Sequence, residues 1–124
     1  MNIRHLNSTH NDWVRALQFY KEEILILRQR LNEVASKNAA QEVLAEVEHY
    51  ENQFSLHTEV IENLLNDIKA NIAATRKELA KRSGFDSDDH LPVKMDQLEQ
   101  QYIVEEKLVL ELRQPFSRFC AEWM

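Results

Sequence analysis

The sequence is poor in the two residues that make tight turns, with one Gly and two Pro among its 124 residues. A β-rich fold needs many such turns, and they depend on glycine, proline and Asn-Gly pairs. Their scarcity argues against a β-rich fold. It favours a small number of long helices joined by few connections.

Other features are also missing, and each excludes a class of protein. There is one cysteine, Cys120, so an internal disulfide and a cysteine-based metal site are excluded. No apolar run approaches the roughly 20 residues of a membrane span, and the N-terminal residues lack the apolar core of a signal peptide. We therefore expect no membrane association and a cytoplasmic location. The net charge of -6 argues against binding to nucleic acid, which requires clustered lysine and arginine.

What is present is hydrophobic periodicity. With 44% hydrophobic and 29% charged residues, a chain of this length predicts one helical domain over residues 1–124. Between residues 8 and 36, apolar residues recur at steps of four and three, the heptad spacing of helices that pack nearly parallel. We call such a line of residues a seam. The first seam is Trp13, Leu17, Tyr20, Ile24, Leu27, Leu31 and Val34.

Two further helices are predicted, over residues 38–82 and 91–123. Asn38 followed by Gln41 has the spacing of a capping box at the start of the second helix. The seam of that helix takes two successive steps of four, from His57 to Ile61 to Leu65, which predicts a stutter. The three segments together predict an all-α, antiparallel, up-down-up three-helix bundle with coiled-coil-like helices, of which the second is the longest.

Counting residues outward from the two turns indicates which parts of the helices lie side by side. The first helix should cover the second only to about Leu65, or to Ile72 if it begins at Ile3. Beyond that level the second and third helices would form a two-helix arm with an exposed seam, and an exposed apolar patch is typical of an interface. We therefore predict a homodimer formed through the arm. The predicted interface residues are Ile68, Ile72, Leu79, Leu91, Met95, Leu98 and Tyr102.

Three polar residues occupy seam positions: His10, His57 and Glu105. Residue counting places His10 and Glu105 at one level and His57 about two turns away. We therefore expect His10 to pair with Glu105, because a buried carboxylate needs a partner. One interpretation is a structural pair that fixes the register of the helices. The other is part of a metal or acid–base site, although two ligands do not fill a zinc shell.

A second candidate metal motif is Glu46-Val47-Glu48-His49, a Glu-x-x-His sequence. Ferritin-like di-iron bundles use two such motifs with two further glutamates, whereas this chain has one. Asp86-Ser87-Asp88-Asp89-His90 does not match a calcium-binding EF-hand loop, since it lacks the required Gly and Glu. We interpret it as a loop with helix-capping residues.

Charge is divided along the second predicted helix. Residues 39–67 contain seven acids and no Lys or Arg, whereas residues 69–82 contain five bases and one acid. Such runs are usually solvated faces. The alternatives are an acidic stripe that meets a basic partner, or an antiparallel dimer in which acidic and basic segments meet.

Several stretches resemble a family of small uncharacterised helical proteins from Bacteroidetes-type bacteria. They are residues 13–24, 30–38 and 47–54, the Asp89-His90 pair, and the ending with Phe116, Phe119 and Trp123-Met124. The family has no assigned activity, so the resemblance implies no site. It makes His49, Asp89 and His90 worth testing.

No catalytic constellation, phosphate-binding loop or cofactor motif is present in the sequence. We therefore expect a non-enzymatic helical protein without a cofactor, which acts through protein–protein contacts and first through self-association over residues 68–102. The alternative is a metal-binding bundle like ferritin or hemerythrin, using His10, His57, Glu105, Glu46 or His49.

Overall fold

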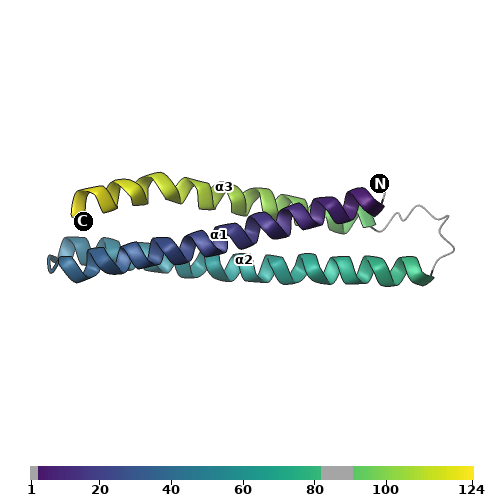
Figure 1. The fold of residues 1–124 in the computed structure, drawn as a ribbon, viewed down its shortest axis with the longest axis horizontal. Helices are drawn as coiled ribbons and strands as arrows, with labels where there is room; N and C mark the ends of the chain where they lie inside the picture. Colours follow the sequence, from purple (N-terminus) through teal and green to yellow (C-terminus); the bar gives the residue numbers. More distant parts are fainter. Residues whose placement is uncertain (1–2, 82–90) are drawn as a thin grey trace.

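The computed structural model describes the backbone of residues 3–81 and 91–124, and the side chains of residues 7–77 and 95–124. It contains three helices: α1 (Ile3–Lys37), α2 (Gln41–Lys81) and α3 (Leu91–Trp123). They run up, down and up along one axis, and α2 is the longest (Figure 1). The predicted all-α, three-helix bundle is confirmed.

The start of α1 differs from the prediction. The helix begins at Ile3 rather than near Ser8. A start at Ile3 is the alternative that the sequence analysis allowed. His10 is fully buried, and tertiary contacts of this kind supply most of the stability of helices in proteins.

The predicted capping box at Asn38 and Gln41 is also wrong. α2 begins at Gln41, and the carbonyl of Ala40 accepts the first backbone hydrogen bonds, from the N–H groups of Val43 and Leu44. The Asn38 side chain instead donates hydrogen bonds to α1 and α3. Its Nδ2 donates to the carbonyl oxygen of Val34 at 2.8 Å and to that of Trp123 at 2.9 Å.

Asn38 thereby satisfies carbonyls at the C-terminal ends of α1 and α3 together. Both carbonyls lie in the last helical turns, where backbone acceptors have no partner within the helix. One amide thus holds the two ends side by side, close to the turn that leads into α2.

The core follows the predicted seams. In α1, Trp13, Leu17, Ile24, Leu31 and Val34 are buried. In α2 the buried positions continue after Ile61 through Leu64, Ile68, Asn71 and Thr75, with Leu65 also buried. This sequence of steps keeps the heptad rhythm, so the predicted stutter is not needed. The prediction continued the seam from Ile61 to Leu65 rather than to Leu64, and therefore passed over Asn71.

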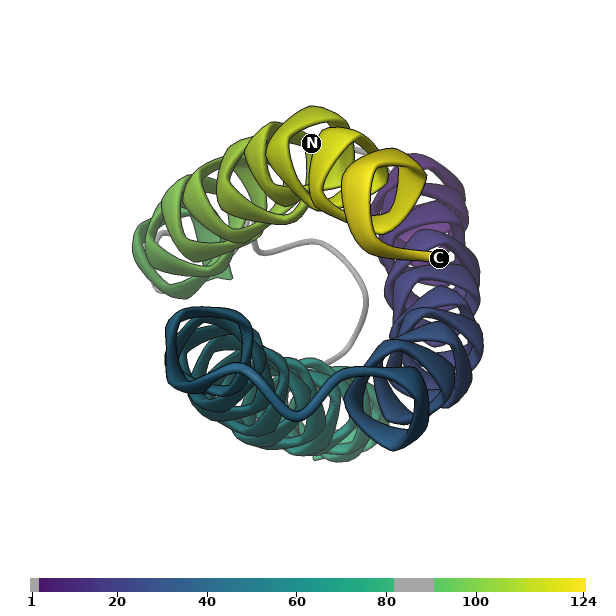
Figure 2. The same cartoon turned by 90° about the vertical axis from the view of Figure 1, so that its left-hand side faces the viewer.

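In the residues that the structure describes, α1 continues along α2 past Leu65, where a two-helix arm was predicted, since His10 lies beside Asn71. Trp13 of α1 stacks on Tyr102 of α3, with ring centroids 5.6 Å apart, so α1 reaches the N-terminal half of α3. Figure 2 shows the three helices arranged around a common axis. Ile68, Met95 and Leu98 are already buried inside this one chain, and Ile72 packs against the same core. Three of the predicted interface residues, Ile68, Met95 and Leu98, thus belong to the core of a single chain.

Leu79 and Leu91, the other two predicted interface positions, fall outside the residues whose side chains the structure describes. The loop residues Asp86 to His90 fall outside it entirely. No helix within the described residues is long and apolar enough to cross a membrane.

The error in the arm has a geometrical cause. Counting residues outward from the turn between α2 and α3 places His57 opposite Phe116. In the structure, His57 lies opposite Glu105. The two helices are therefore offset by about three turns from the counted position. Counting assumes a tight turn, but the offset between two helices is set by which side chains pack together.

Candidate functional site: a groove between α2 and α3

A groove of about 550 Å³ lies between α2 and α3. It extends along α2 from Leu56 to Asp67, which is about three helical turns. Its lining comes from these two helices alone. The lining residues are Leu56, His57, Val60, Asn63, Leu64, Asp67, Gln100, Gln101, Val104, Glu105 and Leu108.

The walls of the groove are apolar and exposed. Leu56 is 51% exposed, Val104 53%, Leu108 40% and Val60 37%. On each helix the two residues are four positions apart, so they lie one above the other on the same face. The groove thus has an apolar ridge on either side, and these ridges are not covered by α1.

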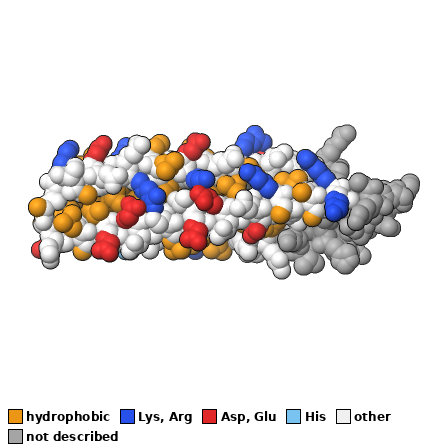
Figure 3. Space-filling view, turned by 90° about the horizontal axis from the view of Figure 1, so that it is seen from below, with side chains coloured by type: hydrophobic (Ala, Val, Ile, Leu, Met, Phe, Trp, Pro, Cys, Tyr) orange, Lys and Arg blue, Asp and Glu red, His pale blue; other side chains and the backbone are white. Residues whose placement is uncertain are grey.

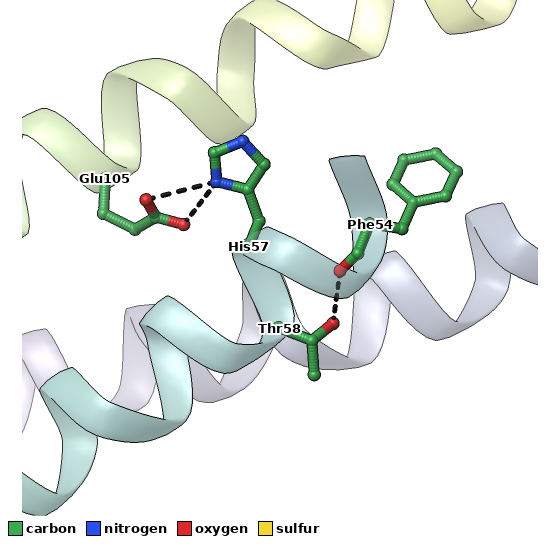
Figure 4. A network of polar contacts seen from close by, with 4 residues as sticks. All are labelled: Phe54, His57, Thr58 and Glu105. Atoms are coloured by element: carbon green, nitrogen blue, oxygen red, sulfur yellow. Dashed lines mark hydrogen bonds and ion pairs between the residues drawn. The ribbon is translucent and has the colours of Figure 1, made fainter. Parts of the chain in front are cut away.

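The floor of the groove contains a buried polar pair. Nδ1 of His57 lies 2.9 Å from one carboxylate oxygen of Glu105 and 3.2 Å from the other. Figure 4 shows the two side chains reaching toward each other from α2 and α3. The side chains of both residues are almost fully buried.

Burial raises the pKa of the Glu105 carboxyl above the ordinary value of a glutamate, and the hydrogen bond and charge of His57 act in the opposite direction. The bond to His57 satisfies the buried carboxylate and fixes one level at which α2 and α3 meet.

The other end of the groove is polar. Asn63, Asp67, Gln100 and Gln101 line it, and no lysine or arginine contributes to any part of the lining. Asp67 and the floor residue Glu105 are the acidic residues of the lining. The groove therefore offers an apolar half, an amide-rich half and negative charge.

The predicted pairing of His10 with Glu105 is wrong. Nε2 of His10 lies 3.2 Å from Nδ2 of Asn71, both side chains being buried, while Glu105 is paired with His57. The two histidines thus serve different levels of the bundle. Asn71 was not identified from the sequence, because an asparagine was not expected in the core.

The Glu-x-x-His motif faces solvent. Glu46 and His49 are both exposed on α2, and the His49 ring contacts the edge of Tyr50 with centroids 5.2 Å apart. In the described part of the chain, no group of three or more His, Cys, Asp or Glu side chains is placed to hold a metal ion.

A polar cluster closes the opposite side of α3, where it meets α1. The hydroxyls of Tyr20 and Tyr102 both donate to Oε2 of Glu106, at 2.8 and 2.7 Å. Arg113 donates twice to Oε1 of Glu23, at 3.0 and 2.8 Å, and its guanidinium lies 5.9 Å from the centre of the Tyr20 ring. Burial, followed by the bond to Glu106, raises the pKa of both tyrosines.

The tyrosines therefore stay protonated and act as hydrogen-bond donors. These bonds join α1 to α3 along this side of the bundle.

Comparison with known proteins gives no relative for the chain: no protein-family model, no curated protein and no solved structure matches it.

The groove was missed by the sequence analysis, although a signal for it exists. Leu56 and Val60 on α2, and Val104 and Leu108 on α3, lie off the seams, and each pair repeats at a spacing of four. A second apolar stripe on each of two neighbouring helices predicts a second packing face. Only the offset between the helices reveals that the two stripes flank one groove.

Proposed function

We propose that this protein is a non-enzymatic helical bundle that acts by binding another polypeptide chain. The observation that supports this most directly is the groove between α2 and α3, with four exposed aliphatic side chains on its walls. A groove of three turns suits a helix, because an amphipathic helix places its apolar side chains into such a groove at spacings of three and four.

The contacts of the potentially catalytic polar groups also support a non-enzymatic role. In the described residues, His57 and Glu105 pair with each other, and Tyr20 and Tyr102 pair with Glu106. A general base or nucleophile has to reach a substrate atom, and these groups are held by partners inside the bundle.

The test is a photocrosslinking experiment with the full-length chain in the cells that make it. A photoreactive amino acid replaces Val104 in one variant and Ile26, an exposed residue of α1, in the matched control. We expect a crosslinked polypeptide from position 104 and not from position 26. The proposal fails if position 104 crosslinks to no polypeptide, or if both positions crosslink equally.

The alternative of a metal-binding bundle is tested separately by elemental analysis of protein purified without chelator or histidine tag. Stoichiometric iron, manganese or zinc would overturn the proposed function in favour of that alternative. Binding that disappears in a His57→Leu/Glu105→Leu variant would locate the metal at the floor of the groove.

A further inference from the structure

The exposed surface of α2 contains one continuous stripe that runs through the groove and beyond it. Leu56, Val60, Asn63 and Asp67 lie on the groove side of the helix. At the same spacing of three and four, the stripe continues through exposed Ala70, Ala74 and Lys77. The same helix thus carries both a groove wall and a small-residue ridge that could enter a groove.

The charge along this helix changes sign at Ile68. Up to Asp67 the charged residues of α2 are all acidic, and from Lys69 onward they are basic except for Glu78. Figure 3 shows basic side chains next to the grey residues, and both basic and acidic side chains over the rest of this face. A helix divided in this way is complementary to itself only when two copies run antiparallel, because parallel copies would place like charges together.

Among the described residues, some charged residues of α2 are already paired inside the chain, and others are not. Glu51 and Glu62 already form ion pairs with Arg28 and Lys21 of α1, at 3.3 and 3.2 Å. By contrast, none of Glu59, Asp67, Lys69 and Lys77 forms an ion pair with a residue that the structure describes, and all four are exposed. These four charges therefore remain for a contact outside the chain.

We propose that a second copy of this chain fills the groove, in a two-fold dimer whose axis passes near Ile68 of α2. This inference rests on the proposed function and names its first partner. In this arrangement Glu59 faces Lys77 of the second copy, and the acidic part of each α2 lies beside the basic part of the other. Each contact occurs twice, as in every isologous dimer.

The occupant of the groove is then the segment of the second α2 that contains Ala70, Ala74 and Lys77. Its alanines let the two helix axes approach closely, since the distance between packed helices depends on the side chains at the contact. The apolar walls formed by Val60, Val104 and their neighbours supply the buried area. The charge pairs set orientation and register, because exposed ion pairs contribute little affinity themselves.

The experiment is sedimentation equilibrium of the full chain at tens of micromolar, with two charge-reversed variants. Glu59→Lys/Asp67→Lys makes α2 basic, and Lys69→Glu/Lys77→Glu makes it acidic. We expect a dimer for the unchanged chain and a dissociation constant raised about tenfold or more in each variant. The combined fourfold variant restores the opposite charges and is expected to recover the dimer.

A matched control, Arg30→Glu, changes one exposed charge on α1 and is expected to leave the dimer intact. Circular dichroism of every variant checks that the helices are retained. A monomeric unchanged chain overturns the inference, as does a dimer that both reversals leave unaffected, or a fourfold variant that stays monomeric.

The two proposals can fail separately. If position 104 crosslinks to a different protein while the purified chain sediments as a monomer, the second copy is the wrong occupant and the proposed function stands. If position 104 crosslinks to nothing and the chain is a monomer, both are wrong.

Discussion

The two sides of α3 differ in how they meet their neighbouring helices. Toward α1, the packed Trp13–Tyr102 pair is bordered by hydrogen bonds from two tyrosines to Glu106 and by the Arg113–Glu23 pair. Toward α2, the buried His57–Glu105 pair is bordered by exposed aliphatic side chains. On the α1 side, polar residues at the edge of the seam form hydrogen bonds between the two helices and cover the seam. On the α2 side, the residues at the edge are aliphatic and remain exposed.

This difference separates a surface that completes the fold from one that is left for another molecule. Residues of the α1 side should therefore contribute to stability, and those on the groove walls should contribute to association. Substitutions on the two sides of α3 test that division.

Trp13→Ala removes the aromatic side chain that joins α1 to α3. Because this residue is buried and stacked on Tyr102, we expect a loss of about 4 kcal/mol in the free energy of unfolding. Urea unfolding followed by circular dichroism measures it. Phe19→Ala is the matched control, since Phe19 is 57% exposed, and it should change stability by less than about 0.5 kcal/mol. Equal losses would refute the assignment of Trp13 to the seam.

Glu105→Leu alone removes one member of the buried pair and leaves His57 without its partner. We expect a loss of about 3 kcal/mol in unfolding free energy, since breaking a buried pair leaves a desolvated polar group. The double variant His57→Leu/Glu105→Leu should recover most of that loss, because apolar residues of similar volume replace both. If the double variant is no more stable than Glu105→Leu, the pair does not act as a unit.

The pH dependence of stability provides a second test of the same pair. Since burial raises the pKa of Glu105, the folded chain binds this proton more tightly than the unfolded chain. Its contribution to stability is complete below the ordinary pKa of a glutamate and falls as pH rises through the raised pKa. The stability of the unchanged chain relative to Glu105→Gln should therefore decrease over that window. A relative stability that rises with pH would contradict the direction of the shift.

Glu106→Gln weakens the acceptor that two tyrosine hydroxyls share. The expected loss is about 1 kcal/mol, because the cluster is only partly buried and loses its charge assistance. Thermal unfolding detects this size of change in a small domain. Glu99→Gln, at an exposed position of the same helix, is the control and should have no measurable effect.

Val104→Gln on the groove wall should have the smallest effect on the isolated chain. Val104 is 53% exposed, so we expect a change of less than about 0.5 kcal/mol in unfolding free energy at low protein concentration. At higher concentration a dimer stabilises the folded chain by mass action. The variant should then have a lower free energy of unfolding than the unchanged chain. A difference that is independent of concentration would argue against an interface at this residue.

The helices and their buried faces follow from the sequence. The lack of glycine and proline, together with heptad spacing, predicts three long helices and the burial of residues such as Leu17, Ile24, Phe54 and Phe116. This works because the helical repeat is a local property, so the side chains that share a face can be read from their spacing.

The partner of each buried polar residue does not follow from the sequence. His10, His57 and Glu105 were all recognised as seam residues, yet His57 takes Glu105 and His10 takes Asn71. The reason is that successive layers of a heptad seam resemble one another. Periodicity therefore shows which face is buried and leaves open which layer of one helix meets which layer of the next.

The offset between the helices was thus decided by tertiary packing, and the candidate site depends on it. Leu56 and Val60 on one helix and Val104 and Leu108 on another flank a groove only at the observed offset. The sequence by itself determined three helices, their buried faces and the division of charge along α2. The tertiary structure decided which polar side chains pair and where an apolar surface stays open, because both depend on how far one helix is displaced along its neighbour.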